Sequence, residues 1–184
     1  MKVCSRTITL RASTGIAALA VVSAASADVT YTLTNATFTG AQFTEAYAAG
    51  SLSGTMTGAS INMTLISASG QTYANDLAFM VIEPSDVQIL QVGGADLMGY
   101  PLQKYDWPNG GSSAPGTTCI GTVTFTTAVS MAVPTRSILI GNAYGAGGPG
   151  TWSGTITLHG VNAVPAPGAI AILGLVGLSS RRRR

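Results

Sequence analysis

Short runs in which apolar and polar residues alternate dominate the middle of this chain. The clearest run covers residues 29–33, where Val, Tyr and Leu alternate with threonine. A period of two is typical of a half-buried β-strand. This pattern, together with short apolar runs bounded by turn residues, predicts eight strands, at residues 29–33, 52–56, 61–65, 77–82, 87–92, 122–126, 137–140 and 152–158.

Two of these runs allow a more specific prediction. Residues 77–82 are continuously apolar, as expected of a strand covered on both faces or central in its sheet. In the last run, alternation divides the side chains between two faces. One face carries Trp152, Gly154, Ile156 and Leu158, and the other carries Ser153, Thr155, Thr157 and His159. We therefore expect Trp152 in the core.

Turn residues separate the predicted strands, and blocks of helix-forming residues are absent. The pattern favours an all-β fold, a single antiparallel β-sandwich or jelly roll of about eight strands, at residues 28–162. A segment of about 135 residues is long enough to bury its own core. The long connections at residues 93–118 and 141–150 are the expected functional surface, because binding residues concentrate in loops on a rigid scaffold.

The first 27 residues have the organisation of a secretory signal peptide. A basic start is followed by a short apolar stretch and then by a small-x-small cleavage signal, formed by Ala25 and Ala27 just before Asp28. We expect the Sec export machinery to translocate the chain and signal peptidase to cut between Ala27 and Asp28.

Residues 163–184 form a second targeting segment in three parts. A proline-containing box comes first, made of Val164, Pro165, Ala166, Pro167 and Gly168, and residues 169–178 are then apolar or glycine. We expect these to form a hydrophobic helix that is marginal as an anchor, because a full span needs about 20 residues. The segment ends in Arg181, Arg182, Arg183 and Arg184, which should stay on the cytoplasmic side.

The order of box, apolar helix and arginine cluster resembles the PEP-CTERM sorting signal of bacterial surface proteins. The family's usual glutamate between the prolines is Ala166 here, which makes this a Pro-Ala-Pro variant. The resemblance implies sorting by an exosortase-like membrane enzyme and transient anchoring in the inner membrane. The protein would then pass to the outer envelope or the extracellular space, with exopolysaccharide as a candidate partner.

Two shorter segments are similar to motifs of P-domain-like jelly rolls. Residues 75–85 resemble an inner strand and its turn, and residues 150–158 resemble the closing strand. The family's closing motif ends in an acidic residue, whereas this chain has His159 at that place. The resemblance supports the sandwich prediction and assigns no activity.

Charge is concentrated in the two targeting segments. The segment between them contains two basic residues, Lys104 and Arg136, and all seven acidic residues of the chain, so the predicted domain is mildly acidic. Nucleic-acid binding needs a clustered basic surface and is therefore not expected. Cys119 and His159 are the single cysteine and histidine of the predicted mature chain. They allow no internal disulfide and no Cys/His zinc site, and we expect neither a metal nor a cofactor.

The candidate ligand-binding residues are Tyr105, Trp107 and Asp76. The two aromatic side chains lie in the first long connection, where they could form a sugar-stacking platform or close the end of the core. Asp76 follows Asn75, and with a loop carbonyl this pair could bind calcium. His159 is expected to face solvent rather than to act as a base, because no serine lies in a recognisable nucleophile elbow.

These observations favour a secreted, non-enzymatic protein of the cell surface or extracellular matrix. The alternative is a carbohydrate- or calcium-binding β-sandwich module that uses the long loops. A hydrolase is a distant third hypothesis, since catalysis needs tuned acid–base or nucleophilic groups gathered in one site, and no catalytic residue is assigned.

Overall fold

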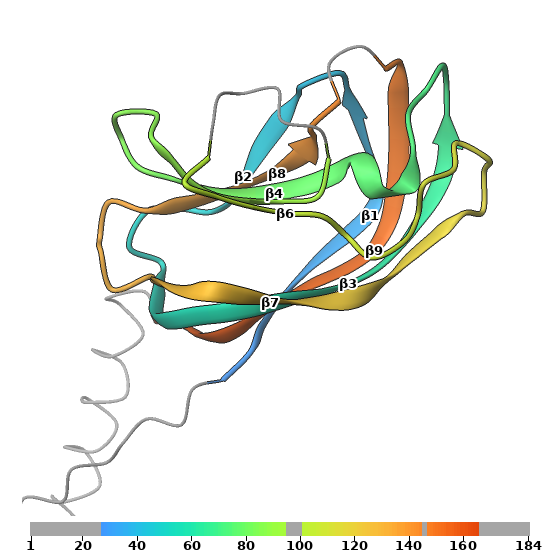
Figure 1. Ribbon diagram of the computed structural model, residues 1–184. Helices are drawn as coiled ribbons and strands as arrows, with labels where there is room; N and C mark the ends of the chain where they lie inside the picture. Colours follow the sequence, from blue (N-terminus) through green and yellow to red (C-terminus); the bar gives the residue numbers. More distant parts are fainter. Residues whose placement is uncertain (1–26, 95–100, 145–146, 166–184) are drawn as a thin grey trace, which may run out of the picture.

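The computed structural model describes residues 27–94, 101–144 and 147–165. Within them the protein is all-β, and two sheets face one another (Figure 1). The four-stranded sheet has the order β1 (Val29–Thr39), β9 (Pro149–Ala163), β3 (Leu52–Ala68), β7 (Thr118–Ser130). The five-stranded sheet has the order β2 (Phe43–Tyr47), β8 (Ser137–Asn142), β4 (Leu77–Ile82), β5 (Gln88–Val92), β6 (Gln103–Tyr105). One 3-10 turn, η1 (Ala74–Asp76), links β3 to β4.

The prediction of eight antiparallel strands is wrong in three details. The runs at residues 52–56 and 61–65 belong to one 17-residue strand, β3. They were predicted as two strands because the alternation is interrupted where the register shifts between Met56 and Gly58. Strands β2 and β6 lie at the edges of their sheet, without a fully buried residue, and the sequence gives them no apolar alternation. Strand β6 also pairs with β5 in parallel, so the five-stranded sheet is mixed.

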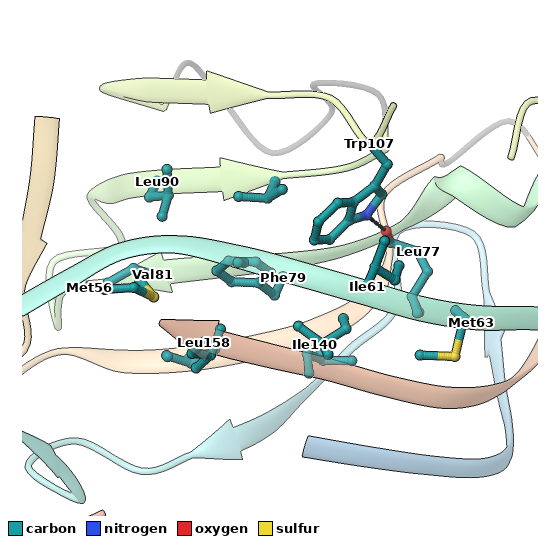
Figure 2. Close-up of a cluster of buried hydrophobic side chains, with 14 of the residues drawn as sticks. Met56, Ile61, Met63, Leu77, Phe79, Val81, Leu90, Trp107, Ile140 and Leu158 are labelled. Carbon is teal, nitrogen blue, oxygen red and sulfur yellow. Dashed lines mark hydrogen bonds between the residues drawn. The ribbon is translucent and has the colours of Figure 1, made fainter. Parts of the chain in front are cut away.

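The apolar inner faces of both sheets form one core. Strand β4 lies in the middle of the five-stranded sheet and is buried along nearly its whole length, which confirms the prediction for residues 77–82. Figure 2 shows Phe79 and Val81 of β4 facing the core together with Leu90 of β5, opposite Ile61 and Met56 of β3. Such burial contributes on the order of 25 cal/mol per Å² of apolar surface, which makes it the main stabilising term here.

The predicted division of β9 into two faces is confirmed. Trp152, Ile156 and Leu158 are at most 1% exposed, whereas the threonines between them are partly exposed. Strands β1, β3 and β7 repeat this arrangement, so the outer face of the four-stranded sheet is built largely from Ser and Thr. None of its four strands contains Lys, Arg, Asp or Glu.

A β-bulge adjusts the pairing of β1 with β9. Leu33 pairs with Gly154 and Ala36 with Trp152, so two residues of β1 lie opposite one residue of β9. Asn35 takes up the extra length in a left-handed conformation, with φ 49°. Gly154 has φ +143°, and a Cβ there would lie 2.2 Å from the Asn62 carbonyl oxygen. Glycine at residue 154 therefore lets β9 pass close to β3.

The two ends of the sandwich domain lie close together. Before β1, the Ala27 amide donates to Asn162 Oδ1 at 3.0 Å. After β9, the Val164 amide donates to the Ser51 carbonyl at 2.8 Å. The predicted signal peptide up to residue 26 and the predicted helix and arginine cluster lie outside the described residues. In the described part of the chain, no helix is long and apolar enough to cross a membrane.

We predict that Trp152→Ala destabilises the protein by about 3–5 kcal/mol, because it leaves a cavity in the core and frees the Ala74 carbonyl. The indole is fully buried and donates to that carbonyl at 3.1 Å. Urea unfolding measures the change, with Ile66→Ala as the control, since Ile66 is 44% exposed on β3. Equal effects of the two substitutions would contradict the packing described.

Candidate ligand-binding pocket

A pocket of about 440 Å³ lies at the end of the sandwich away from the chain ends. Strand β3 begins beside the end of β9, where Leu52 pairs with Ala163, and finishes beside the start of β9, where Ala68 pairs with Gly150. The turn η1 follows this far end of β3. The residues that line the pocket come from η1 and from the connections on either side of β6: Tyr73, Asn75, Asp76, Gly94, Asp106, Trp107 and Gly111.

Two tryptophans fix the position of η1. Trp152, from the four-stranded sheet, donates its indole N–H to the Ala74 carbonyl at 3.1 Å. Trp107 donates to the Leu77 carbonyl at 2.8 Å, as the dashed line in Figure 2 shows. Each bond satisfies a buried indole donor and a backbone acceptor, one at each end of the turn. Asp76, which lies between Ala74 and Leu77 in the sequence, is therefore held from both sides.

The carboxylate of Asp76 is the buried charged group of the pocket. The residue is 7% exposed, and its Oδ2 accepts the Tyr73 amide at 2.7 Å in a capping arrangement. Burial raises the pKa of Asp76, and the hydrogen bond from the Tyr73 amide opposes this effect in part. A buried carboxylate that lines a pocket can accept hydrogen bonds from hydroxyl or amine groups of a ligand.

Asp106 lines the pocket, and its partner Lys104 lies next to it without lining the pocket. Lys104 Nζ lies 2.8 Å from Asp106 Oδ1 and donates to the Gly94 carbonyl at 2.7 Å. The Asp106 side chain is 82% exposed, whereas the Lys104 side chain is 27% exposed. This pair is too solvated to contribute much stability, but it places one positive and one negative group at the edge of the site.

The structure brings together two of the three residues predicted to bind a ligand. Asp76 and Trp107 line the same pocket. Trp107 is 4% exposed and packs against Phe79 with ring centroids 6.2 Å apart, so it closes the core and presents little ring surface to a sugar. Tyr105 does not line the pocket. Its ring stacks on Phe125 and its hydroxyl lies 2.8 Å from Thr126 Oγ1.

Sequence reasoning named Asn75 beside Asp76 but missed four other lining residues of the pocket, which are Tyr73, Gly94, Asp106 and Gly111. Tyr73 and Gly111 enter only because η1 and the turn after Trp107 are hydrogen-bonded to each other, with the Asn75 amide donating to the Gly110 carbonyl at 3.2 Å. The polar pair at residues 75–76 just before an apolar strand was the available signal for the site. No comparable signal in the sequence indicated Asp106.

The remaining candidate residues lie elsewhere. His159 is on the outer face of the four-stranded sheet, as predicted, but its side chain is only 29% exposed and it contacts Asp28 and Ser60. Cys119 is fully buried in β7, and burial raises the pKa of its thiol to about 11, so it is a poor nucleophile. Of the predicted sorting box, Val164 and Pro165 are within the described residues, whereas Ala166, Pro167 and Gly168 are not. Ala25 of the predicted cleavage signal and residues 169–184 also lie outside the described residues.

The described residues form no cluster of three or more His, Cys, Asp or Glu side chains that could hold a metal ion. No family model, curated protein or solved structure matches the chain. The geometry of the pocket and of the chain ends therefore carries the functional argument.

We predict that Asp76→Asn raises the melting temperature at about pH 7, with a gain that disappears near pH 3, below the ordinary aspartate pKa. The raised pKa means that the fold favours the protonated carboxyl. That contribution is complete below the unfolded pKa and is lost as pH rises through the folded pKa. An asparagine oxygen can still accept the Tyr73 amide without the charge.

Thermal unfolding at the two pH values tests this prediction. Asp106→Asn is the control, because its exposed carboxylate should give little change in melting temperature at either pH. A lower melting temperature for Asp76→Asn at neutral pH would show that the charged form is the one that the fold stabilises.

Proposed function

We propose that this chain is an exported protein of the bacterial cell surface or extracellular matrix that serves in binding and matrix structure. Export would use the Sec machinery and signal peptidase, and an exosortase-like enzyme would sort the protein through residues 163–184. The protein would be held briefly in the inner membrane and would then reach the outer envelope or the extracellular space.

One observation carries this proposal. The two ends of the domain emerge at one end of the sandwich (Figure 1), and the Asp76 pocket lies at the other. The last described backbone hydrogen bond of the domain is made by Val164, the first residue of the proline-containing box. A protein tethered through its tail would therefore hold its pocket away from the membrane, where polymers of the envelope are accessible.

The absence of charge on the four-stranded sheet supports the same role. A face of Ser and Thr side chains without Lys, Arg, Asp or Glu in its strands does not repel or concentrate ions. Its hydroxyls can exchange hydrogen bonds with a neutral polyhydroxylated matrix. The ligand that we propose for the pocket is therefore a neutral saccharide unit of an exopolysaccharide, with Asp76 accepting hydrogen bonds from its hydroxyl groups.

We also propose that the sandwich is a jelly roll, a fold of eight strands in two sheets that contains two Greek keys. In support of this, β1 pairs with β9, β2 with β8, β3 with β7 and β4 with β5. This is the nesting expected when one long antiparallel ribbon is rolled up into two sheets. Strand β6 is an additional edge strand.

The intact mass of the protein purified from its own cells tests export and sorting. We expect a chain that begins at Asp28 and that has lost the arginine cluster by cleavage near Pro165–Pro167. Fractionation of the same cells should place this species in the outer envelope or the medium. A cytosolic protein that retains Met1 and Arg184 would overturn the proposal.

Titration of the cell-derived protein with neutral exopolysaccharide fragments tests the pocket. Losing a hydrogen bond to a charged group costs about 1.5–3 kcal/mol, so Asp76→Asn should weaken binding at least about tenfold. Asp86→Asn is the matched control, because Asp86 is an exposed carboxylate in the turn after β4 and does not line this pocket.

A parallel titration with Ca²⁺ separates the second candidate ligand. Saturable calcium binding that Asp76→Asn abolishes, without saccharide binding, would make the pocket a cation site built from Asp76, Asn75 and backbone carbonyls. Binding of neither ligand would leave the tethered domain with a purely structural role in the matrix.

A further inference from the structure

Three side chains from distant parts of the sequence form a hydrogen-bonded chain on the four-stranded sheet. Ser60 lies on β3, His159 on β9, and Asp28 immediately before β1. Ser60 Oγ is 2.7 Å from His159 Nε2, and His159 Nδ1 is 2.8 Å from Asp28 Oδ2. Sheet register brings them together, because β9 lies between β1 and β3 in the sheet order.

The connectivity assigns a distinct task to each group. With its proton on Nδ1, His159 donates to the Asp28 carboxylate and leaves Nε2 free to accept the Ser60 hydroxyl proton. This is the order in which an activated serine, a general base and an orienting acid are joined in acyl-transfer enzymes. The Gly160 amide donates to the second Asp28 oxygen at 3.3 Å, which fixes the direction of the carboxylate.

The electrostatics of these three hydrogen-bonded side chains match the tasks assigned to them. The hydrogen bonds from His159 and from the Gly160 amide lower the pKa of Asp28, so its carboxylate stays ionised and can stabilise an imidazolium. Thr122 Oγ1, on β7, is 2.7 Å from Ser60 Oγ. Because the Ser60 hydroxyl donates to His159 Nε2 in this arrangement, the Thr122 hydroxyl donates to Ser60 Oγ, next to the point of attack, where charge would develop on an acyl oxygen.

The surroundings of Ser60 limit the substrate. Neither the Asp76 pocket nor the apolar pocket at Met80 and Leu139 is lined by Ser60, so neither offers it an acyl-chain site. The register instead places Ser60 in a row with Thr157 and Thr122, on a face whose strands carry no Lys, Arg, Asp or Glu. A small acyl group on an extended, neutral, hydroxyl-rich polymer fits such a face.

We propose that Ser60, His159 and Asp28 form a catalytic site that removes small acyl esters, such as acetyl esters, from a neutral polysaccharide. This activity goes beyond the binding role proposed above and does not depend on it. It also revises the expectation that His159 takes no part in chemistry, which rested on the polar face of its strand and on the lack of a serine in a recognisable nucleophile elbow.

The proposed reaction consumes the ester and one water molecule and needs no other reactant. Ser60 Oγ attacks the ester carbonyl while His159 Nε2 takes the hydroxyl proton, and the alcohol leaves with that proton as the C–O bond breaks. Water then attacks the acyl-Ser60 ester, His159 again takes a proton, and the carboxylic acid leaves as Ser60 regains its hydrogen. Thr122 supplies a hydroxyl rather than a pair of backbone amides to the oxyanion, so we expect slow turnover.

A fluorophosphonate probe tests the site in the full chain. Ser60 would form the O–P bond as fluoride leaves and His159 takes the proton. In the wild-type protein, peptide mass mapping should find the label on Ser60 and not on Ser153. Ser153 is the matched reference because it lies on the same outer face but donates a hydrogen bond to Asn35, with Oγ 3.0 Å from Asn35 Oδ1. Absence of label on Ser60, or equal label on both serines, would overturn the proposal.

Substitutions then separate catalysis from a structural tie between strands. His159→Ala should slow labelling of Ser60 by about 100-fold, the typical share of a general base, whereas Ser153→Ala should leave it unchanged. Acetate release from an acetylated polysaccharide should disappear in Ser60→Ala. Melting temperatures of the variants identify any loss of fold. If folded His159→Ala labels as fast as the wild type, His159 is a structural residue and the proposal fails.

Discussion

The placement of η1 by two buried indoles is the constraint on which the distal end of the molecule depends. Trp152 reaches across from the four-stranded sheet to the Ala74 carbonyl, and Trp107 reaches from the connection after β6 to the Leu77 carbonyl. Both rings also fill the core, against Phe38 and Phe79. Apolar burial and backbone satisfaction therefore act at the same two residues. The buried carboxylate of Asp76 between them is stabilised in part by the hydrogen bond that its Oδ2 accepts from the Tyr73 amide.

The scarcity of charge gives the rest of the fold its character. The Arg136 guanidinium donates to Glu83 Oε1 at 2.9 and 3.0 Å and to the Ser130 carbonyl at 2.7 Å, which ties the β4–β5 turn to the end of β7. In the rest of the described residues, most stabilising contacts are apolar packing and sheet hydrogen bonds. A sandwich held in this way keeps an outer face whose strands carry no Lys, Arg, Asp or Glu, with the Asp28 carboxylate at its edge. Such a face suits the neutral polymer that we propose as its surroundings and leaves specificity to a few polar groups.

Those polar groups lie in two separate places with different physical settings. Asp76 is buried and lines a pocket, where we propose that it recognises a ligand. Ser60, His159 and Asp28 lie on an open face, where groups joined by short hydrogen bonds can act on a polymer that lies across the sheet. The two sites can be tested independently, since no residue belongs to both.

The sequence by itself determined the strands with clear alternation, the central position of residues 77–82 and the two faces of β9, because side-chain period and burial are local properties. It also determined that Trp152 is core and that the domain lacks a basic surface. Only the tertiary structure decided which strands pair, that β5 and β6 run parallel, and that Trp107 closes the core. The convergence of Ser60, His159 and Asp28 was equally invisible, because sheet register joins residues about 100 positions apart (Ser60 to His159, |i−j| = 99) and no local pattern encodes that pairing.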